Sequence, residues 1–215
     1  MKGILWDLDG TLLNTLTDLA ASVNFALRSL GFPERTVEEV RRFVGNGAAR
    51  LITLALPEEG KAHFDEAFEL FREHYAHHSD DATCPYEGIP ELLERLKKKG
   101  YTMGIVSNKP DFAVKDLARL YFPAVAVAAG EKAGVPRKPN PDGLYLAMEG
   151  MGVKKEDCIY IGDSEVDVAT AKNTGIPCIA VTWGFRSEET LREAGAVHFA
   201  HTAEELIAKI SELLP

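Results

Sequence analysis

Short apolar segments alternate with amphipathic segments along most of this chain. Residues 3–9 form an apolar run that ends in two carboxylates and Gly10, which predicts a buried strand followed by a turn. Later runs of apolar, often β-branched residues have the same character, at 102–107, 124–127, 158–162 and 178–182. Helical patterns lie between them, at 89–99, closed by Gly100, and at 140–151, where Asn140 and Pro141 suit a helix start. This alternation predicts an α/β fold with a parallel sheet and helices on both faces.

The strand pattern disappears between residues 15 and 82. This segment has a helical pattern only: a first helix is expected from about residue 17 to 30, and Thr36 with Glu39 has the pattern of a capping box. We therefore expect a core of residues 1–14 and 83–215, with a small α-helical cap domain, residues 15–82, inserted after the first strand. Such an insertion is expected over the carboxyl edge of the sheet, where open α/β sheets bind ligands.

Composition narrows the range of partners. The chain has 24 Lys and Arg against 33 Asp and Glu, a net charge of −9, which disfavours binding to nucleic acid. A small phosphorylated metabolite remains possible, because one locally positive pocket or a bound cation can attract it. No apolar run is long enough to cross a membrane, and the first seven residues do not have the pattern of a secretory signal. The three cysteines form no C-x-x-C pair, so we expect reduced thiols. We expect a cytoplasmic protein that is a monomer or a homodimer.

Asp7 and Asp9 stand at the end of the first expected strand. Two aspartates at such a place are often only a turn or a solvated edge, because Asp favours turns. Here the preceding residues are apolar, and a carboxylate at the end of a buried strand is costly unless a metal or hydrogen-bond donors satisfy it. A turn after Asp7 would let both carboxylates serve one site. We therefore interpret both aspartates as functional.

A second pair of carboxylates, Asp163 and Asp167, follows the expected strand 158–162. Residues four apart can share one face of a helical turn, although Asp163 alone could equally be a helix cap before Ser164. Four carboxylates at one place would repel one another without a hard cation. Mg²⁺ prefers a few carboxylate oxygens together with water and phosphate, so the pattern predicts a magnesium site.

Two further segments carry groups that can hold phosphate. Ser107 and Asn108 offer polar side chains and backbone amides at an expected helix start, although a plain helix-entry turn is the simpler interpretation of this pair taken alone. Lys138 precedes Pro139, and a residue before proline is restricted to extended conformations. An ammonium held in this way can neutralise both an ionised nucleophile and a transferring phosphoryl group.

The order of these motifs resembles that of the haloacid dehalogenase superfamily over nearly the whole chain. The motifs are Asp7-x-Asp9-Gly10-Thr11, Ser107, Lys138-Pro139 and Gly162-Asp163-x-x-x-Asp167. The resemblance implies a Rossmann-like core with a helical cap. It also implies phosphatase or phosphomutase chemistry, because haloacid dehalogenases proper need no proton donor for a halide and lack the aspartate at the position of Asp9.

The same resemblance implies a role for each matched residue. Asp7 would be the nucleophile that forms an aspartyl-phosphate, and Asp9 the general acid and then the general base. Mg²⁺ would be bound by Asp7, the backbone carbonyl of Asp9 and Asp163, with Asp167 either a ligand or a support. The phosphoryl group would be bound by Leu8, Thr11, Ser107, Asn108 and Lys138.

Four segments are similar to phosphoglycolate phosphatases within that superfamily: Gly45-Asn46-Gly47, Ser107-Asn108-Lys109-Pro110, Lys138-Pro139-Asn140-Pro141-Asp142 and Thr182-Trp183-Gly184. This similarity implies hydrolysis of 2-phosphoglycolate. Asn46, Gly47 and Arg50 could hold the substrate carboxylate, or they could be an ordinary loop before a surface arginine. Asn14 and Trp6 depart from the commonest pattern, which affects only the expected fine specificity.

Several alternatives to this function remain open at the level of sequence. The substrate could be another small phosphate ester or pyrophosphate, or the enzyme could be a β-phosphoglucomutase-like mutase. A catalytically silent binding or regulatory protein on the same fold is the alternative from a different class, because a fold does not prove an activity.

Overall fold

The computed structural model describes residues 1–214 of the 215-residue chain. The chain forms two compact units: the first contains Met1–Leu13 and the residues from Pro85 onward, and the second is Asn14–Cys84. Two short strands, β2 (Leu13–Asn14) and β3 (Cys84–Pro85), lie where the chain passes from one unit to the other, and they pair as a two-stranded sheet. No helix among the described residues is long and apolar enough to span a bilayer.

The first unit is built on a six-stranded sheet whose neighbouring strands all pair in parallel, which confirms the predicted fold class. The order across the sheet is β5-β4-β1-β6-β7-β8. In chain order these strands are β1 (Gly3–Trp6), β4 (Thr102–Pro110), β5 (Val127–Glu131), β6 (Cys158–Gly162), β7 (Cys178–Val181) and β8 (His198–Ala200).

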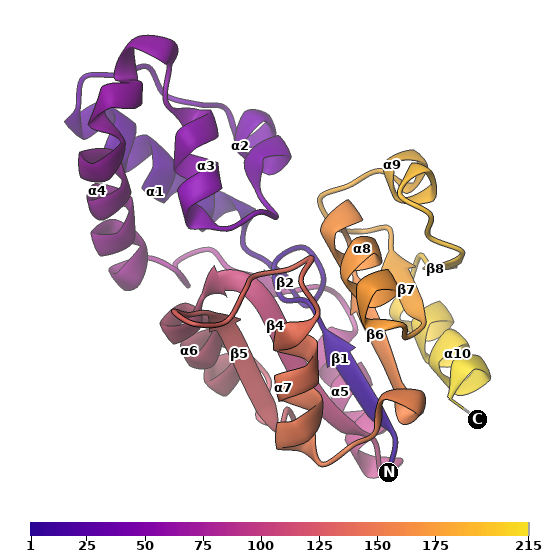
Figure 1. Ribbon diagram of the computed structural model, residues 1–215. Coiled ribbons are helices and arrows are strands. Elements are labelled where there is room, and N and C mark those ends of the chain that lie inside the picture. Colours follow the sequence, from indigo (N-terminus) through magenta and orange to yellow (C-terminus); the bar gives the residue numbers. More distant parts are fainter. Residues whose placement is uncertain (215) are drawn as a thin grey trace. The chain divides into compact units, whose positions relative to one another are not determined.

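Alternation of side chains along β1 divides the core into two layers. Ile4 and Trp6 pack on one face of the sheet and Leu5 packs on the other, as expected for a strand buried on both faces. The face with Ile4 is covered by α5 (Ile89–Lys98), α6 (Asp111–Tyr121) and α10 (Ala203–Leu213) (Figure 1). The face with Leu5 is covered by α7 (Asp142–Met151) and α8 (Glu165–Thr174), and α9 (Glu188–Glu193) packs beside β7.

The connections place a switch in strand order at β1. The chain visits β4 and β5 on one side of β1 and then returns to β6, β7 and β8 on the other side. Loops that follow β4 and β6 therefore leave the sheet in opposite directions. In open α/β sheets the crevice at the carboxyl ends of such strands is the usual ligand site.

Three predicted boundaries need correction. The strand expected at 124–127 begins only at Val127, because Val125 closes a turn onto the carbonyl of Phe122 and β5 takes its register from Gly104 of β4. The helix expected from Asn140 begins at Asp142, since the Asn140 side chain accepts a hydrogen bond from the Asp142 amide and so forms a local turn. The strand expected to end at residue 107 continues as β4 to Pro110, with a shift in its pairing with β5 after Val106.

The second unit is helical throughout, apart from the residues that it contributes to β2 and β3. Its elements are α1 (Leu16–Ser29), α2 (Val37–Phe43), α3 (Ala48–Ala55), a 3₁₀ segment, η1 (Glu58–His63), and α4 (Phe64–His77). The predicted capping box of Thr36 and Glu39 is confirmed at the start of α2. The buried carboxylate of Asp18 accepts hydrogen bonds from the amides of Ala82 and Thr83, which ties the last residues of this unit to its first helix.

Candidate active site

Asp7 and Asp9 leave β1 through a tight turn. The Asp7 amide still donates to the Ile161 carbonyl of β6, 2.8 Å away, as if β1 continued by one residue. The amides of Thr11, Leu12 and Leu13 then donate to the Leu8 carbonyl. Gly10 has a φ of 84°, a conformation that favours glycine. The predicted turn after Asp7 is therefore present.

A buried lysine connects three groups beside this turn. Lys138 Nζ donates to Asp7 Oδ1 at 2.7 Å, to Asp167 Oδ1 at 2.7 Å and to the Tyr160 hydroxyl at 2.9 Å. Its side chain is 4% exposed, so all three contacts lie away from bulk water. We call Asp7, Lys138, Tyr160 and Asp167 the Lys138 cluster. Because an ammonium has three protons, these contacts satisfy it completely.

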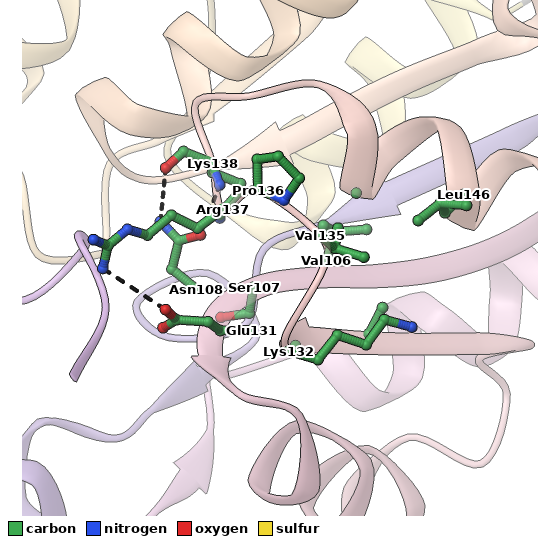
Figure 2. A pocket seen from close by; sticks show the side chains of 13 residues that line it. Val106, Ser107, Asn108, Glu131, Lys132, Val135, Pro136, Arg137, Lys138 and Leu146 are labelled. Carbon is green, nitrogen blue, oxygen red and sulfur yellow. Dashed lines mark hydrogen bonds and ion pairs between the residues drawn. The ribbon is translucent and has the colours of Figure 1, made fainter. Parts of the chain in front are cut away.

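Asn108 fixes the backbone of Lys138. The Asn108 side chain accepts from the Lys138 amide at 2.8 Å and donates to the Lys138 carbonyl at 3.0 Å (Figure 2). The paired contacts join the end of β4 to the loop before α7. The Asn108 side chain therefore positions Lys138, and the predicted contact of Asn108 with phosphate stays a prediction.

Asp167 holds Lys138 from the opposite side. Its Oδ1 contacts Lys138 and Tyr160, while its Oδ2 accepts from the Ser164 amide at 3.0 Å and the Ser164 hydroxyl at 2.6 Å. The last two contacts belong to the capping box that begins α8. With both oxygens engaged in this way, Asp167 is better suited to support Lys138 than to bind a cation directly.

Asp163 sits just before α8, and Ser164 is the residue that caps this helix. The Asp163 carboxylate accepts from the Thr11 hydroxyl at 3.1 Å and from the Phe185 amide at 2.7 Å. Two glycines make room for it: a Cβ at Gly10 would lie 2.3 Å from Asp163 Oδ2, and a Cβ at Gly184 would lie 2.3 Å from Asp163 Cβ. The loop after β7 therefore encloses this carboxylate, which explains the Trp183-Gly184 segment in physical terms.

Burial perturbs the ionisation of this group of acids. Burial raises the pKa of Asp7 to about 7, and the negative charge of Asp167 adds to the rise, while Lys138 opposes it. Burial, with the charges of Asp167 and Asp7, holds the pKa of Asp163 well above its usual range. Burial alone would lower the pKa of Lys138, but the charges of Asp167 and Asp7 raise it instead, so the lysine stays protonated.

The donor set fits a hard cation. One carboxylate oxygen from each of Asp7, Asp163 and Asp167 can be chosen so that all lie within 4.8 Å of one another. Asp7, Asp163 and Asp167 are all buried, and Lys138, which contacts Asp7 and Asp167, supplies one positive charge, so the three carboxylates carry an excess of negative charge when all are ionised. Oxygen ligands with excess negative charge are the surroundings that Mg²⁺ prefers.

A pocket opens beside this group, between the carboxyl ends of β4 and β5 and the loop that leads to α7. Its empty volume is about 420 Å³, which includes space that is open to solvent. Ser107, Asn108 and Lys138 line one side, and Glu131 and Arg137 form an ion pair at its edge (Figure 2). The pocket thus brings together the sequence-predicted residues of β4 and of the α7 loop.

The remaining predicted phosphate contacts have different surroundings. Ser107 is buried, and its hydroxyl accepts from the Lys109 amide at 3.3 Å. The Leu8 side chain is fully buried, so only its backbone could contact a ligand. In the helical unit, Gly47 caps the start of α3 with a φ of 81°, and Asn46 and Arg50 are exposed.

Two residues of this region were missed by sequence reasoning. The Tyr160 hydroxyl is part of the Lys138 cluster, although the residue is an ordinary strand position by pattern. Lys109 is buried, and its Nζ donates to Asp9 Oδ1 at 2.8 Å. For Lys109 the available signals were its place directly after Ser107 and Asn108 and the similarity of this segment to phosphoglycolate phosphatases, neither of which indicated its pairing with Asp9.

Comparison with known proteins gives a consistent result. The family model described as haloacid dehalogenase-like hydrolase matches residues 4–181. The chain is 35% identical over 194 residues to a phosphoglycolate phosphatase of Xylella fastidiosa, covering 87% of this chain and 83% of that one. It is 34% identical over 221 residues to a phosphoglycolate phosphatase of Vibrio parahaemolyticus, covering 98% and 96%.

Structural comparison agrees with these relatives. The crystal structure of a protein from Lactobacillus delbrueckii subsp. bulgaricus is similar to this structure with a TM-score of 0.90 at 35% identity, covering 98% of this chain and 99% of that one. Both the sequence motifs and the parallel sheet thus match one group of enzymes. This chain belongs to the haloacid dehalogenase-like hydrolases and is similar to the phosphoglycolate phosphatases among them.

Proposed function

We propose that this protein is a magnesium-dependent phosphatase that hydrolyses a small phosphate monoester through a phosphorylated Asp7. The observation that carries the proposal is the position of Asp7: its carboxylate is buried at the sheet edge, and Lys138 holds one of its oxygens at 2.7 Å. Among residues 1–214 no second side-chain donor contacts the Asp7 carboxylate, so its other oxygen can face phosphorus or a cation.

The first step would transfer the phosphoryl group to Asp7. An Asp7 oxygen forms a bond to phosphorus while the bond from phosphorus to the ester oxygen breaks. Asp9 gives its proton to the departing oxygen, so the leaving group departs as a neutral alcohol. Lys138 favours the ionised form of Asp7, because an adjacent ammonium stabilises the carboxylate.

The second step would release phosphate. Asp9, now a carboxylate, takes a proton from a water molecule as that water attacks the phosphorus of the aspartyl-phosphate. The bond between phosphorus and Asp7 breaks, inorganic phosphate leaves, and Asp9 carries its proton again. The proposed contacts of the phosphoryl oxygens are Thr11 and the backbone of Leu8, in the turn after β1, and Ser107 and Asn108, which line the pocket at the end of β4.

Mg²⁺ would be held by Asp7, the Asp9 backbone carbonyl and Asp163. When bound, it supplies positive charge that neutralises the clustered carboxylates and the phosphoryl oxygens. The supporting feature is the set of closely spaced carboxylate oxygens, which has more negative charge than Lys138 can compensate.

The leading substrate is 2-phosphoglycolate. This assignment rests on the names of the relatives in Xylella fastidiosa and Vibrio parahaemolyticus. We further propose that the helical unit, residues 14–84, acts as a cap and that Asn46, Gly47 and Arg50 bind the glycolate carboxylate. An exposed arginine near a helix start is suited to a carboxylate.

Phosphate release from a panel of phosphate compounds tests this function. The panel contains 2-phosphoglycolate, other small esters, a hexose 1-phosphate and pyrophosphate, each assayed with Mg²⁺ and with excess chelator. We expect magnesium-dependent release that is fastest with 2-phosphoglycolate. Preference for another ester would remove the substrate assignment, and isomerisation of the sugar phosphate without phosphate release would indicate a mutase. No turnover of any compound would contradict the phosphatase proposal.

A further inference from the structure

Lys109 is one of two buried lysines among residues 1–214, the other being Lys138. Its side chain is 1% exposed, and its Nζ donates to Asp9 Oδ1 at 2.8 Å. Lysine is almost never fully buried without a partner of opposite charge, because an ammonium loses its hydration there. We call Lys109 and Asp9 the Lys109 pair.

The backbone that carries Lys109 is tightly held. A Cβ at Gly130 of β5 would lie 2.5 Å from the Lys109 carbonyl oxygen, so the two strands approach as closely as a glycine permits. The Lys109 amide donates to the Ser107 hydroxyl, and the Gly130 amide donates to Asp111 Oδ1 at 3.0 Å. The ammonium is therefore presented from a fixed strand end.

The contact with Lys109 holds the Asp9 side chain at one carboxylate oxygen, Oδ1. Asp9 is more exposed than its partner, with 13% of its side chain accessible. A carboxylate that exchanges protons with an ester oxygen and a water must point to one place, and misplacement by about 1 Å is costly. A short charge-assisted hydrogen bond to Oδ1 sets that direction, so the proton that Asp9 transfers must be carried by its other oxygen, Oδ2.

We propose that Lys109 is a positioning residue that orients Asp9 for proton transfer. This inference rests on the proposed function, in which Asp9 is the general acid and base. Lys109 acts through Asp9 and not through the phosphoryl group, because its ammonium is directed to Asp9 while Lys138 serves Asp7. The two neighbouring acids thus have separate lysines.

The leaving group of the substrate provides the test. An alkyl ester such as 2-phosphoglycolate needs a proton on its departing oxygen, whereas p-nitrophenyl phosphate releases a stable anion. The ratio kcat/KM reports the steps up to the departure of the leaving group, so hydrolysis of the aspartyl-phosphate does not affect it. The variants are Lys109→Met, which keeps the length of the side chain without its charge, and Lys109→Arg.

We expect Lys109→Met to lower kcat/KM for the alkyl ester by about 10- to 100-fold, a part of the usual contribution of general acid catalysis. For p-nitrophenyl phosphate we expect a change of less than about 3-fold, since that step requires little protonation. Lys109→Arg should recover part of the activity toward the alkyl ester. In an Asp9→Asn background, Lys109→Met should cause no further loss, because the positioned group is already absent.

The matched control is Lys115→Met, which removes an exposed lysine that pairs with Asp111 on α6. This variant should leave kcat/KM unchanged for both the alkyl ester and p-nitrophenyl phosphate. Equal losses with both esters, or a full additional loss in the Asp9→Asn background, would show that Lys109 has only a structural role. Turnover by the unmodified protein reports on the proposed phosphatase function separately, so the two ideas can fail independently. Urea unfolding of each variant verifies that it is folded.

Discussion

The Lys138 cluster and the Lys109 pair solve the same electrostatic problem differently. Each joins an aspartate of the turn after β1 to a buried lysine at 2.7 or 2.8 Å. In the cluster, Lys138 also contacts Asp167 and Tyr160, and burial with the Asp167 charge raises the pKa of Asp7 to about 7. In the pair, the Asp9 side chain is partly accessible, at 13%.

The difference follows from what each proposed role requires. A nucleophile must stay in one place and stay ionised, which favours a closed network around Asp7. A proton carrier must meet both an ester oxygen and a water, which favours an accessible carboxylate held at one point. Only Leu8 separates the two aspartates, so the turn at Gly10 is what allows such different surroundings.

The largest expected effect is the loss of activity when Asp7 or Asp9 is replaced by asparagine. Asp7→Asn should lower phosphate release by about 10⁴-fold or more, because no nucleophile remains to form the covalent intermediate. Asp9→Asn should lower kcat/KM for an alkyl ester by about 10²- to 10⁴-fold, the range of general acid catalysis. Steady-state kinetics on 2-phosphoglycolate measures both. Unchanged hydrolysis by Asp7→Asn would contradict the covalent mechanism.

The next largest effect is a difference between the two lysine variants in the free energy of unfolding. In chelator at pH 8, Lys138→Met should reduce the free energy of unfolding by about 3–5 kcal/mol, since it leaves two buried carboxylates without their cation. Lys109→Met should cost less, about 1–3 kcal/mol, because Asp9 retains some access to water. Urea denaturation measures both, with Lys115→Met as an exposed control. A larger loss for Lys109→Met would reverse the proposed ranking of the two networks.

The smallest expected effect concerns pH and magnesium. The pKa of Asp7 is about 7 in the folded protein against an ordinary value of 3.8. The contribution of this group to stability is therefore complete below pH 3.8 and is lost as pH rises through 7 in chelator. Mg²⁺ binds the ionised carboxylates, so it should raise the melting temperature more at pH 8 than at pH 5.

Differential scanning fluorimetry measures this difference. With Mg²⁺ at 100 times its dissociation constant, the stabilisation is about 2.7 kcal/mol, or roughly 5–10 °C for a chain of this size. Asp163→Asn should abolish most of the shift, because it removes a proposed ligand. Equal shifts at both pH values, or the same shift in Asp163→Asn, would argue against the carboxylates as the binding site.

Much of the fold could be predicted from the pattern of residues. The apolar run before Asp7 and the later β-branched runs fix which segments become buried strands, and their alternation with helices implies parallel pairing. The errors lie where local signals conflict with pairing. β5 begins at Val127 and not at 124 because its register is set by β4, a neighbour that no local pattern identifies.

The site could be predicted only in outline. Asp7, Asp9, Lys138 and Asp163 were recognisable as polar groups at the ends of apolar runs. Their pairing was not recognisable, because Lys138 is 131 residues from Asp7 and Lys109 is 100 residues from Asp9. For the same reason no local pattern indicated that the Asn108 side chain bonds to the Lys138 backbone, whereas its contact with phosphate stays a prediction.

The sequence by itself determined the fold class, the helical insertion and the chemical types gathered for the proposed reaction, because strand burial and turn formation depend on local residue patterns. Only the tertiary structure determined that Lys109 bonds to Asp9 and Lys138 to Asp7, and that the Tyr160 hydroxyl belongs to the Lys138 cluster. The physical reason is that parallel strands far apart in the chain meet at one sheet edge, where contacts depend on strand order and register.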